Sequence, residues 1–200
     1  MQKQHGSSQS TTNNNEINQL YPTIAKFTAT FHPARIQEFA AHPSRCVTGS
    51  APSLVQLRYA YSGAAHLQWL IAQIATFQEQ SSVPNKMTSH EVETLSQNIY
   101  AEFYHLKTTE IMLFLAQLLG GKYPIDFHGY LSPAKIILAL RNHFVPWRNR
   151  ILDEHEQVLQ QQKEKEERLR NPPVSWEEYC RMKGIDKPNP LITHHLTPNT

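Results

Sequence analysis

The sequence predicts an all-α fold, a compact helical bundle with a projecting C-terminal helix and flexible tails. Apolar residues recur every three or four positions, which is the spacing of one face of an α-helix. Ser and Thr residues stand where N-caps are expected, and the segment Ile111–Leu119 is polar only at Gln117. A helix that is apolar all round is a buried helix, so this segment predicts the centre of the bundle.

Composition divides the chain into four regions. Residues 1–19 form a disordered tail, because their Gln, Ser, Thr and Asn side chains cannot bury enough apolar area to offset chain entropy. Residues 20–150 form the helical bundle domain. Residues 151–170 form a projecting charged helix, and residues 171–200 form a tail with a short capped helix.

The first half of the bundle is punctuated by prolines and glycines. A short helix over 33–41 is predicted to begin at Pro33, and residues 42–52 read as a loop because Pro, Gly, Ser and Thr gather there. A helix over 53–78 follows. Its apolar face changes direction near Gly63, so the helix breaks there or both of its faces are covered.

The second half has clearer helix starts and stops. Thr88 and Glu91 form a capping box that opens a helix. Thr108 or Thr109 is expected to cap the apolar helix, and Gly120 to end it in a left-handed conformation. The stripe on the helix that starts at Thr88 comprises Val92, Leu95, Ile99, Phe103 and Leu106.

The last part of the chain begins a helix at Ser132 and Pro133, an N-cap hydroxyl followed by proline in the first turn. Pro146 is expected to kink or restart this helix, and the pattern ends at residues 171–173. A second capping box, residues 175–178, opens a short helix that Gly184 ends. The inner face of the helix after Pro133 comprises Ile136, Ile137, Leu140 and Phe144.

Several classes of protein do not fit this composition. The two cysteines are too few and too far apart for a disulfide framework or a zinc site, which favours a reducing, cytoplasmic location. The polar amino terminus does not resemble a secretory signal, and no apolar run approaches the roughly 20 residues that span a bilayer. We therefore expect no membrane contact.

No catalytic constellation stands out, and we expect neither a cofactor nor a metal. Glu102 and His105 have a spacing that di-iron bundles use, but those bundles need a second copy and further glutamates. Cys46 lies near His42 and Arg45, which could lower its pKa, although a lone Cys in such a segment is more often incidental. The expectation is a protein that is not an enzyme.

The segment 120–133 is the first candidate site. It joins the apolar helix to a basic one and contains glycines, prolines and rings that a plain connector does not need. Its candidate binding residues are Lys122, Tyr123, His128 and Tyr130.

The basic helix after Pro133 is the second candidate, with Arg141, Arg148 and Arg150 as its binding residues. Cations between aromatic residues pair with phosphates and stack on bases, so nucleic acid is one expected partner. The other interpretation is that these arginines only border a buried stripe, as in an ordinary amphipathic helix.

The capped helix in the tail is the third candidate. Trp176 and Tyr179 share an apolar face with Cys180, behind a Pro-Pro break. A short aromatic helix of this kind is typical of a tethered docking element, so residues 171–191 are expected to contact a protein partner. The alternative is that this helix folds back onto its own domain.

Residues 88–150 resemble an uncharacterised bacterial family associated with mobile elements. The resemblance rests on the apolar helix, Gly121-Lys122-Tyr123, Phe127-His128-Gly129, Ser132-Pro133 and Arg141. The chain departs from that pattern at Pro124, where Gly is usual, at His128, where Tyr is usual, and at Ser132, where Asp is usual. The resemblance implies a bacterial origin and the helix boundaries, and no activity.

These observations favour a non-enzymatic accessory or adaptor protein of bacterial mobile DNA. It would contact nucleic acid through the basic helix and a partner through its tail. One alternative is a protein-binding module without nucleic-acid contact, favoured if Arg148 and Arg150 pair with Asp153 and Glu154. A second is an enzyme with a site under the 121–130 loop.

Overall fold

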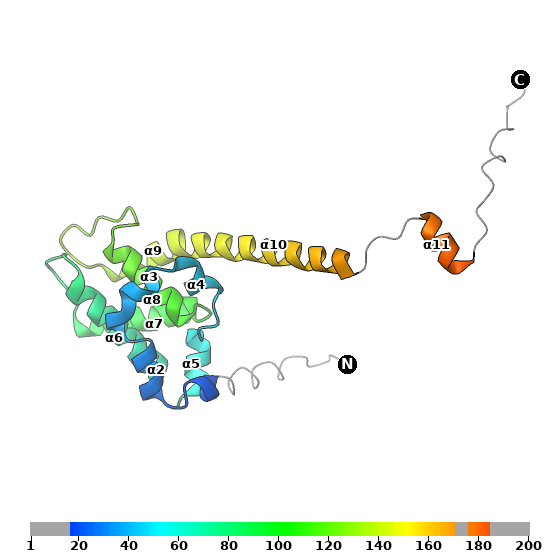
Figure 1. Cartoon of the computed structure of the whole chain (residues 1–200). Helices are drawn as coiled ribbons and strands as arrows, with labels where there is room; N and C mark the ends of the chain where they lie inside the picture. The colour runs from blue at the N-terminus through cyan, green and yellow to red at the C-terminus, as the bar shows by residue number, and fades with distance from the viewer. Residues whose placement is uncertain (1–16, 171–175, 185–200) are drawn as a thin grey trace, which may run out of the picture. The chain divides into compact units, whose positions relative to one another are not determined.

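The computed structural model describes residues 17–170 and 176–184, which are helical almost throughout (Figure 1). The all-α fold class predicted from the sequence is confirmed. Within the described ranges the chain divides at His155, so that residues up to 155 and residues from 156 form separate units. The predicted tail at residues 1–19 lies almost entirely outside the described residues.

The elements run in the order that follows. They are α2 (Ile24–Thr30), the 3-10 helix η1 (Pro33–Arg35), α3 (Ile36–Ala40), α4 (Pro43–Thr48), α5 (Leu54–Ala60), α6 (Ala65–Gln80), α7 (Ser89–Phe103), α8 (Thr108–Leu119), α9 (Pro133–Ala139), the π-helical turn η2 (Leu140–Phe144), α10 (Val145–Arg170) and α11 (Trp176–Lys183).

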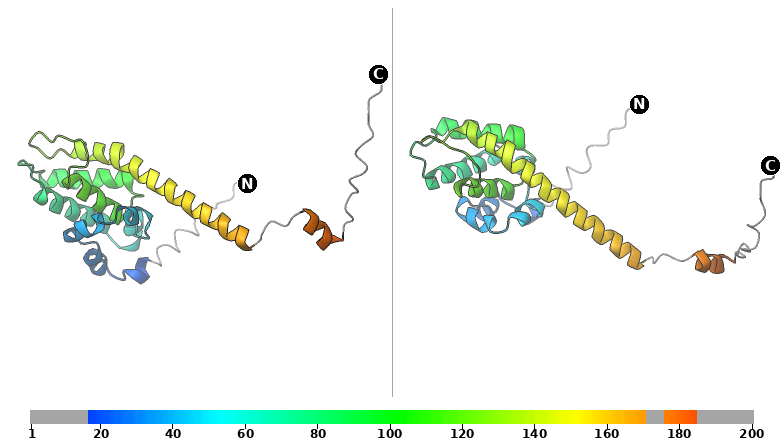
Figure 2. Two further views of the ribbon diagram at one scale, coloured as in Figure 1. Left: turned by 45° about the horizontal axis from the view of Figure 1, so that its top comes forward. Right: turned by 90° about the horizontal axis from the view of Figure 1, so that it is seen from above.

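Helix α8 is the centre of the bundle, as its apolar sequence predicts. Every side chain from Thr108 to Leu118 is buried except that of Gln117, which is half-buried. The helix packs against α3, α4 and α6, while α6 packs against α7, and the views in Figure 2 show these helices gathered around it. Burial of so many large apolar side chains supplies the main favourable free energy of the fold.

The capping box at the start of α7 is confirmed. The hydroxyl of Thr88 accepts the N–H of Glu91, whose carboxylate accepts the N–H of Thr88 at 2.8 Å. The apolar stripe of α7 faces the core, and all of its predicted members are buried. Of the two interpretations of residues 53–78, the break is the one observed, because Gly63 has φ of +73° between α5 and α6.

Two N-terminal predictions need correction. Residues 42–52 are not a loop throughout, because α4 occupies Pro43–Thr48 with Pro43 at its first position. Burial of Cys46 and Val47 in the core outweighs the turn-like composition of this segment. Helix α2 has no counterpart in the sequence prediction, and its Phe27 is fully buried.

Both ends of α8 also differ from the prediction. The residue before the helix is Lys107, not a threonine, because the Glu110 carboxylate accepts the Lys107 N–H at 2.7 Å. At the other end Gly120 is right-handed, and Gly121, with φ of +68°, is the left-handed residue. The helix thus continues one residue further before the chain reverses, with the Lys122 N–H donating to the carbonyl of Gln117.

The helix from Pro133 begins where expected, although the Ser132 side chain makes no capping hydrogen bond. Near Pro146 the chain widens into the π-helical turn η2, closed by a bond from the Val145 N–H to the Leu140 carbonyl. Proline lacks an N–H and its ring crowds the preceding turn, so a distortion of the helix was expected near Pro146. The π-helical turn is that distortion. The described part of helix α10 runs to Arg170.

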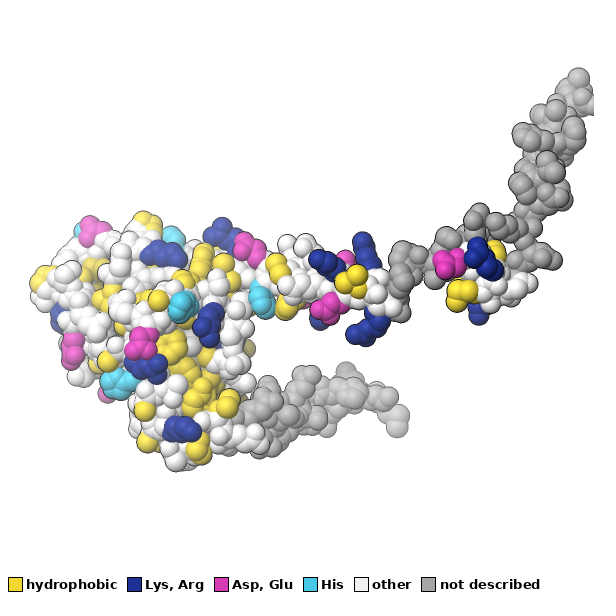
Figure 3. All heavy atoms as spheres, viewed as in Figure 1, with side chains coloured by type: hydrophobic (Ala, Val, Ile, Leu, Met, Phe, Trp, Pro, Cys, Tyr) yellow, Lys and Arg dark blue, Asp and Glu magenta, His cyan; other side chains and the backbone are white. Residues whose placement is uncertain are grey.

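The part of α10 after Leu152 is mostly polar, and so is α11. Side chains from Asp153 to Arg170 are exposed, and charges of both signs lie along α10 (Figure 3). Helix α11 has the predicted bounds and is followed by Gly184. Cys180 is buried and Tyr179 is exposed, whereas the side chain of Trp176 lies outside the described residues.

Candidate interaction surface

The loop after α8 is anchored to the bundle by its tyrosines. Tyr123 is buried, donates its hydroxyl to Gln117 Oε1, and places its ring 5.7 Å from that of Phe114. Burial raises the pKa of Tyr123, so its hydroxyl stays protonated. On its outer side the ring stacks with His143 at 5.8 Å. Tyr123 therefore holds the loop in place and presents little surface to a ligand.

Tyr130 is the second anchor. Its hydroxyl donates to Glu91 Oε1, and this bond, with those from Thr88, lowers the pKa of the Glu91 carboxyl. Next to it, the backbone of Asn85 pairs with Gly129 and Leu131 at 3.1 and 3.0 Å. The loop before α7 and the loop before α9 are thereby joined side by side.

His128 lies on the exposed part of the loop and has φ of +47°, an uncommon conformation for a residue with a side chain. Its Nδ1 is 2.9 Å from Asp126 Oδ2, and its N–H donates to Asp126 Oδ1 at 2.7 Å. Lys135 donates to the carbonyl of Asp126. These groups line a pocket of about 290 Å³ beneath the loop, together with His143.

The arrangement in that pocket bears on the enzyme alternative. Asp126 and His128 side chains are each about three-quarters exposed, and Tyr123 does not line the pocket. Water screens charges in such a setting, so the low-dielectric environment that strengthens catalytic electrostatics is missing. Asp126 and His128 do approach each other in this pocket, with Lys135 and His143 in the same lining, but both side chains of the pair lie largely in solvent.

Lys122 sits over an aromatic ring. Its Nζ is 4.3 Å from the centre of the Trp147 ring, within the range of a cation–π interaction. Partial burial lowers the pKa of Lys122. The ring attracts the ammonium group without neutralising it, so Lys122 still contributes positive charge to this surface.

Arg141 is paired with an acid of α7. Its Nε and NH2 groups donate to the two carboxylate oxygens of Glu102 at 2.5 and 2.6 Å, a bidentate arrangement. The hydrogen bond from Arg141 lowers the pKa of the Glu102 carboxyl. Both side chains are well exposed, at 50% and 37%. The guanidinium charge is therefore compensated on the surface.

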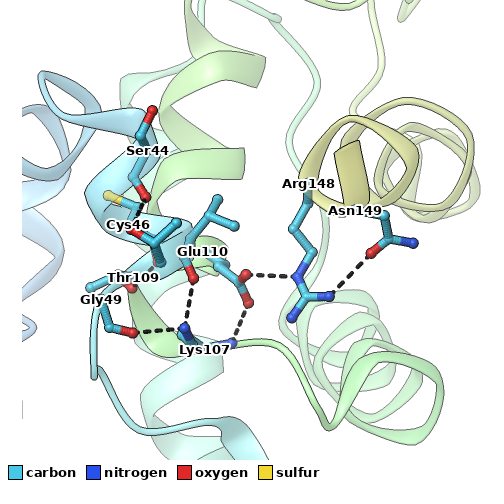
Figure 4. Close-up of polar contacts among 10 residues, drawn as sticks. Ser44, Cys46, Gly49, Lys107, Thr109, Glu110, Arg148 and Asn149 are labelled. Carbon is cyan, nitrogen blue, oxygen red and sulfur yellow. Dashed lines mark hydrogen bonds and ion pairs between the residues drawn. The ribbon is translucent and has the colours of Figure 1, made fainter. Parts of the chain in front are cut away.

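Arg148 is paired inside the bundle (Figure 4). It reaches from α10 to α8, where its Nε donates to Glu110 Oε1 at 2.7 Å. The Glu110 side chain is 0% exposed and that of Arg148 only 15%. The second Glu110 oxygen accepts the Lys107 N–H. A buried carboxylate needs such partners, since removing it from water is costly.

The same cluster also ties down α4. The ammonium group of Lys107 donates to the carbonyls of Val47 and Gly49 at 2.6 and 2.7 Å, and the Thr109 hydroxyl donates to the carbonyl of Cys46 at 2.8 Å. Helix C-terminal carbonyls lack partners within their own helix and favour cations. Helices α4, α8 and α10 are thus joined by one hydrogen-bonded network, the Glu110 network (Figure 4).

Arg150 differs from the other two arginines. It is exposed and makes no hydrogen bond or ion pair with another described residue. Of the cations predicted to contact phosphate, Lys122 and Arg150 form no ion pair with a described acidic side chain. Lys135, which was not among the predicted residues, forms none either. The pairing of Arg148 and Arg150 with Asp153 and Glu154, which would have favoured a module without nucleic-acid contact, is not found among the described residues. Arg148 pairs with Glu110 instead.

A second groove lies on the other side of α9. It has a volume of about 710 Å³ and runs between α7 and α9, with Ala101, Ala134 and Ile137 in its lining and the Glu102–Arg141 pair beside them. Leu138 lines both this groove and the pocket beneath the loop, and its side chain is 46% exposed. We call Leu138, the groove between α7 and α9 and the pocket beneath the loop together the α9 face.

Sequence reasoning missed both Glu110 and the α9 face. A signal for Glu110 was present, since a carboxylate in the first turn of a helix that is otherwise buried needs hydrogen-bonding or cationic partners. The partner itself is 38 residues away, and helical spacing does not relate such positions. The α9 face carries no motif, because its side chains are brought together from α7, α9 and the loop between α8 and α9.

Within residues 17–170 and 176–184, no three His, Cys, Asp or Glu side chains are grouped closely enough to hold a metal ion. No helix in these ranges combines the length and apolar character needed to cross a bilayer.

Comparison with known proteins gives no family assignment. No protein-family profile, curated protein or solved structure matches the chain. The resemblance to a family associated with mobile elements therefore stays a prediction from the sequence.

Proposed function

We propose that the chain is a non-enzymatic adaptor that binds a protein partner on the α9 face. One observation supports the choice of a protein partner over a nucleic acid: Arg148, the central cation of the basic helix, is bound to a fully buried carboxylate within the bundle. A guanidinium held in this way is not available to a phosphate. The alternative in which the arginines border the core thus receives more support than nucleic-acid binding through Arg141 and Arg148.

The α9 face has the chemistry of a protein-binding surface. An exposed leucine stands between two depressions, with aliphatic lining on one side and polar groups on the other. Protein interfaces commonly combine an apolar centre with a polar rim, and a few such residues carry most of the binding free energy. Lys135 and the Glu102–Arg141 pair supply that rim here.

Two further parts of the proposal come from the sequence. Residues 171–191 would hold a second partner through the α11 helix, which makes the protein a connector. The role in bacterial mobile DNA is proposed from the family resemblance. A cytoplasmic location is proposed from the cysteine content.

Nucleic-acid binding is the second candidate, and one observation favours it. Lys122, Lys135 and Arg150 carry charges that no acidic side chain among the described residues neutralises. Three cations give only a modest electrostatic attraction, because affinity for DNA rises with the number of phosphates neutralised. This candidate predicts weak, salt-sensitive binding that depends on those three residues.

Site-specific photocrosslinking tests the proposal. The full chain would carry a photoreactive residue at position 138, or at position 59 as a control, since Tyr59 is also exposed but lies outside the α9 face. In the cells that make the protein, position 138 is expected to give a discrete protein adduct that position 59 does not give. Adducts of equal yield from both positions would contradict specific binding at this face.

DNA anisotropy across a salt series completes the test. The adaptor proposal expects little binding at physiological salt. Tight binding that falls steeply with salt and disappears in the variant Lys122→Ala/Lys135→Ala/Arg150→Ala would favour the nucleic-acid candidate instead.

A further inference from the structure

A cavity in the N-terminal half of the bundle is separate from the α9 face. It has a volume of about 640 Å³, within the range of about 300–1,000 Å³ that is usual for small-molecule sites. Its walls come from the segment around Tyr21, the end of α2, α3, and α4 with the residues that follow it. The cavity therefore lies where short elements meet above the central helix α8.

One wall of this cavity is aromatic. The rings of Tyr21 and Phe31 are 5.5 Å apart, and those of Phe31 and Phe39 are 5.9 Å apart at an interplanar angle of 25°. Phe31 is buried, whereas Tyr21 and Phe39 are half-buried. Phe31 is only 2% exposed, and Arg35 lies over the Phe39 ring at 5.6 Å. The exposed parts of Tyr21 and Phe39 are therefore the ones that can accept a further ring by edge or offset contact.

The charged groups that line the cavity differ in whether they already have a partner within the chain. Arg35 is fully engaged, with Nε and NH2 on Glu38 at 2.9 and 2.8 Å and NH1 on the carbonyl of Thr30 at 2.9 Å. The side chains of Arg45 and His42 line the same cavity and make no hydrogen bond or ion pair with another described residue. One guanidinium charge is thus left without a partner.

Helix α4 fixes the backbone that carries Arg45. The thiol of Cys46 donates to the carbonyl of Phe39 at 3.0 Å, which joins α4 to α3. At the other end of α4, a Cβ on Gly49 would lie 2.5 Å from the carbonyl oxygen of Arg45, so only glycine allows the chain to turn so closely there. The cavity wall that carries Arg45 is consequently well fixed.

The cysteine in this cavity is not suited to covalent chemistry. Burial raises the pKa of the Cys46 thiol to about 11, and the opposite effect of Arg45 is smaller. The sequence suggested that His42 and Arg45 could lower this pKa; Arg45 does act in that direction, but the burial of the thiol outweighs it. A protonated thiol is a poor nucleophile, which favours binding over reaction.

We propose that this cavity binds a small aromatic monocarboxylate, with its ring against Tyr21 and Phe39 and its carboxylate on Arg45. An arginine forms two parallel hydrogen bonds with a carboxylate, which fixes the ligand's orientation as well as its charge. Glu38 is already paired and repels a second acidic group, so a single negative charge fits this site best.

Titration of the full chain with 2-naphthoate, followed by amide chemical shifts, tests the proposal. The expected shifts are confined to residues 21–51 and residue 109, with saturation at or below millimolar concentration. The neutral 2-naphthamide, which lacks the charge, and cyclohexanecarboxylate, which lacks the ring, should each bind at least tenfold more weakly. Equal affinity of all three probes, or shifts elsewhere on the protein, would overturn the proposal.

Variants identify the residue that holds the carboxylate. Arg45→Gln is expected to weaken 2-naphthoate binding at least tenfold, and Arg150→Gln, a matched change outside the cavity, to leave it unaltered. Arg45 is exposed and unpaired, so the folded amide spectrum should persist in the variant. Unchanged affinity of Arg45→Gln would exclude this residue as the carboxylate partner and overturn the proposal.

Discussion

Two arginine–glutamate pairs join the basic helical segment to the rest of the bundle, one a bidentate pair at the surface and the other a single hydrogen bond to a buried carboxylate. Arg148 and Glu110 are 2.7 Å apart, while Arg141 and Glu102 are 2.5 Å apart. Glu110 is fully buried, whereas Glu102 is 37% exposed. The same chemistry thus serves as an internal support in one place and as a solvated contact in the other.

The difference follows from what happens when one partner is lost. An exposed carboxylate that loses its arginine returns to water at little cost. Glu110 has no such access to water, so the loss of either partner would leave a charge buried and unpaired. We therefore regard the Glu110 network as part of the fold and the Glu102–Arg141 pair as part of the surface.

The largest effect is expected from Glu110→Gln. This change keeps the side-chain volume but leaves Arg148 without its anionic partner, and should lower the free energy of unfolding by about 3–5 kcal/mol. Urea denaturation followed by circular dichroism measures the change. The control is Arg150→Ala, because Arg150 lies on the same helix as Arg148 but is exposed. Its free energy of unfolding should stay within about 0.5 kcal/mol of that of the original protein. Equal effects of the two variants would contradict the distinction between buried and exposed pairs.

Lys107→Met should have the next largest effect. The methionine keeps much of the apolar stem but removes the hydrogen bonds to the carbonyls of Val47 and Gly49, with an expected loss of about 1.5–3 kcal/mol. Hydrogen exchange should become faster in α4, because these carbonyls end that helix. Lys86→Met is the matched control, since Lys86 makes a comparable bond to Ser81 at the surface. Faster exchange in α4 of the control as well would argue against a local role for Lys107.

A smaller, pH-dependent effect is expected from His66. This side chain is buried against Tyr100, and burial, followed by the charge of Arg58, lowers its pKa. Above a pH of about 6.5 it is neutral in both states, and its contribution to stability is complete. As pH falls below that value the unfolded chain binds a proton first, so the free energy of unfolding decreases.

His66→Gln removes this titration. Between pH 7 and pH 5 the free energy of unfolding should fall less in this variant than in the original chain. Part of the fall should persist, because burial also lowers the pKa of His105. His143→Gln, an exposed control, should behave as the original chain does. A loss that is identical in all three proteins would rule out His66 as the source.

The smallest effect is expected from Arg141→Ala. Its partner Glu102 is already solvated, so the free energy of unfolding should change by only a small fraction of the Glu110→Gln loss. Added salt should reduce even this difference, since exposed charges are screened. A destabilisation comparable to that of Glu110→Gln would show that surface exposure does not separate the two pairs.

The parts of the fold that the sequence predicted are those governed by local periodicity. The stripes of α7 and α9, the capping box at Thr88 and the buried α8 all follow from residues a few positions apart. Helix α4 was missed because its composition is typical of a loop, and only packing of Cys46 and Val47 against the core makes it helical. Periodicity is visible in a sequence, whereas long-range packing is not.

The candidate site was predicted less well, for a related reason. The rings of the 121–130 loop were interpreted as binding groups, yet Tyr123 and Tyr130 mainly attach the loop to Gln117 and Glu91. Residue type indicates that a hydroxyl or guanidinium needs a partner. Whether that partner lies within the chain or in a ligand depends on residues 39 and 38 positions away, as for Tyr130 and Arg148.

A double-mutant cycle on Glu110 and Arg148 tests the central claim most directly. The free energies of unfolding of the original chain, Glu110→Gln, Arg148→Met and the double variant would be compared. If Arg148 is an internal partner, the coupling energy should lie in the upper part of the roughly 0.5–3 kcal/mol range seen for contacting residues. A coupling energy near zero would contradict the account and return Arg148 to the residues available for phosphate binding.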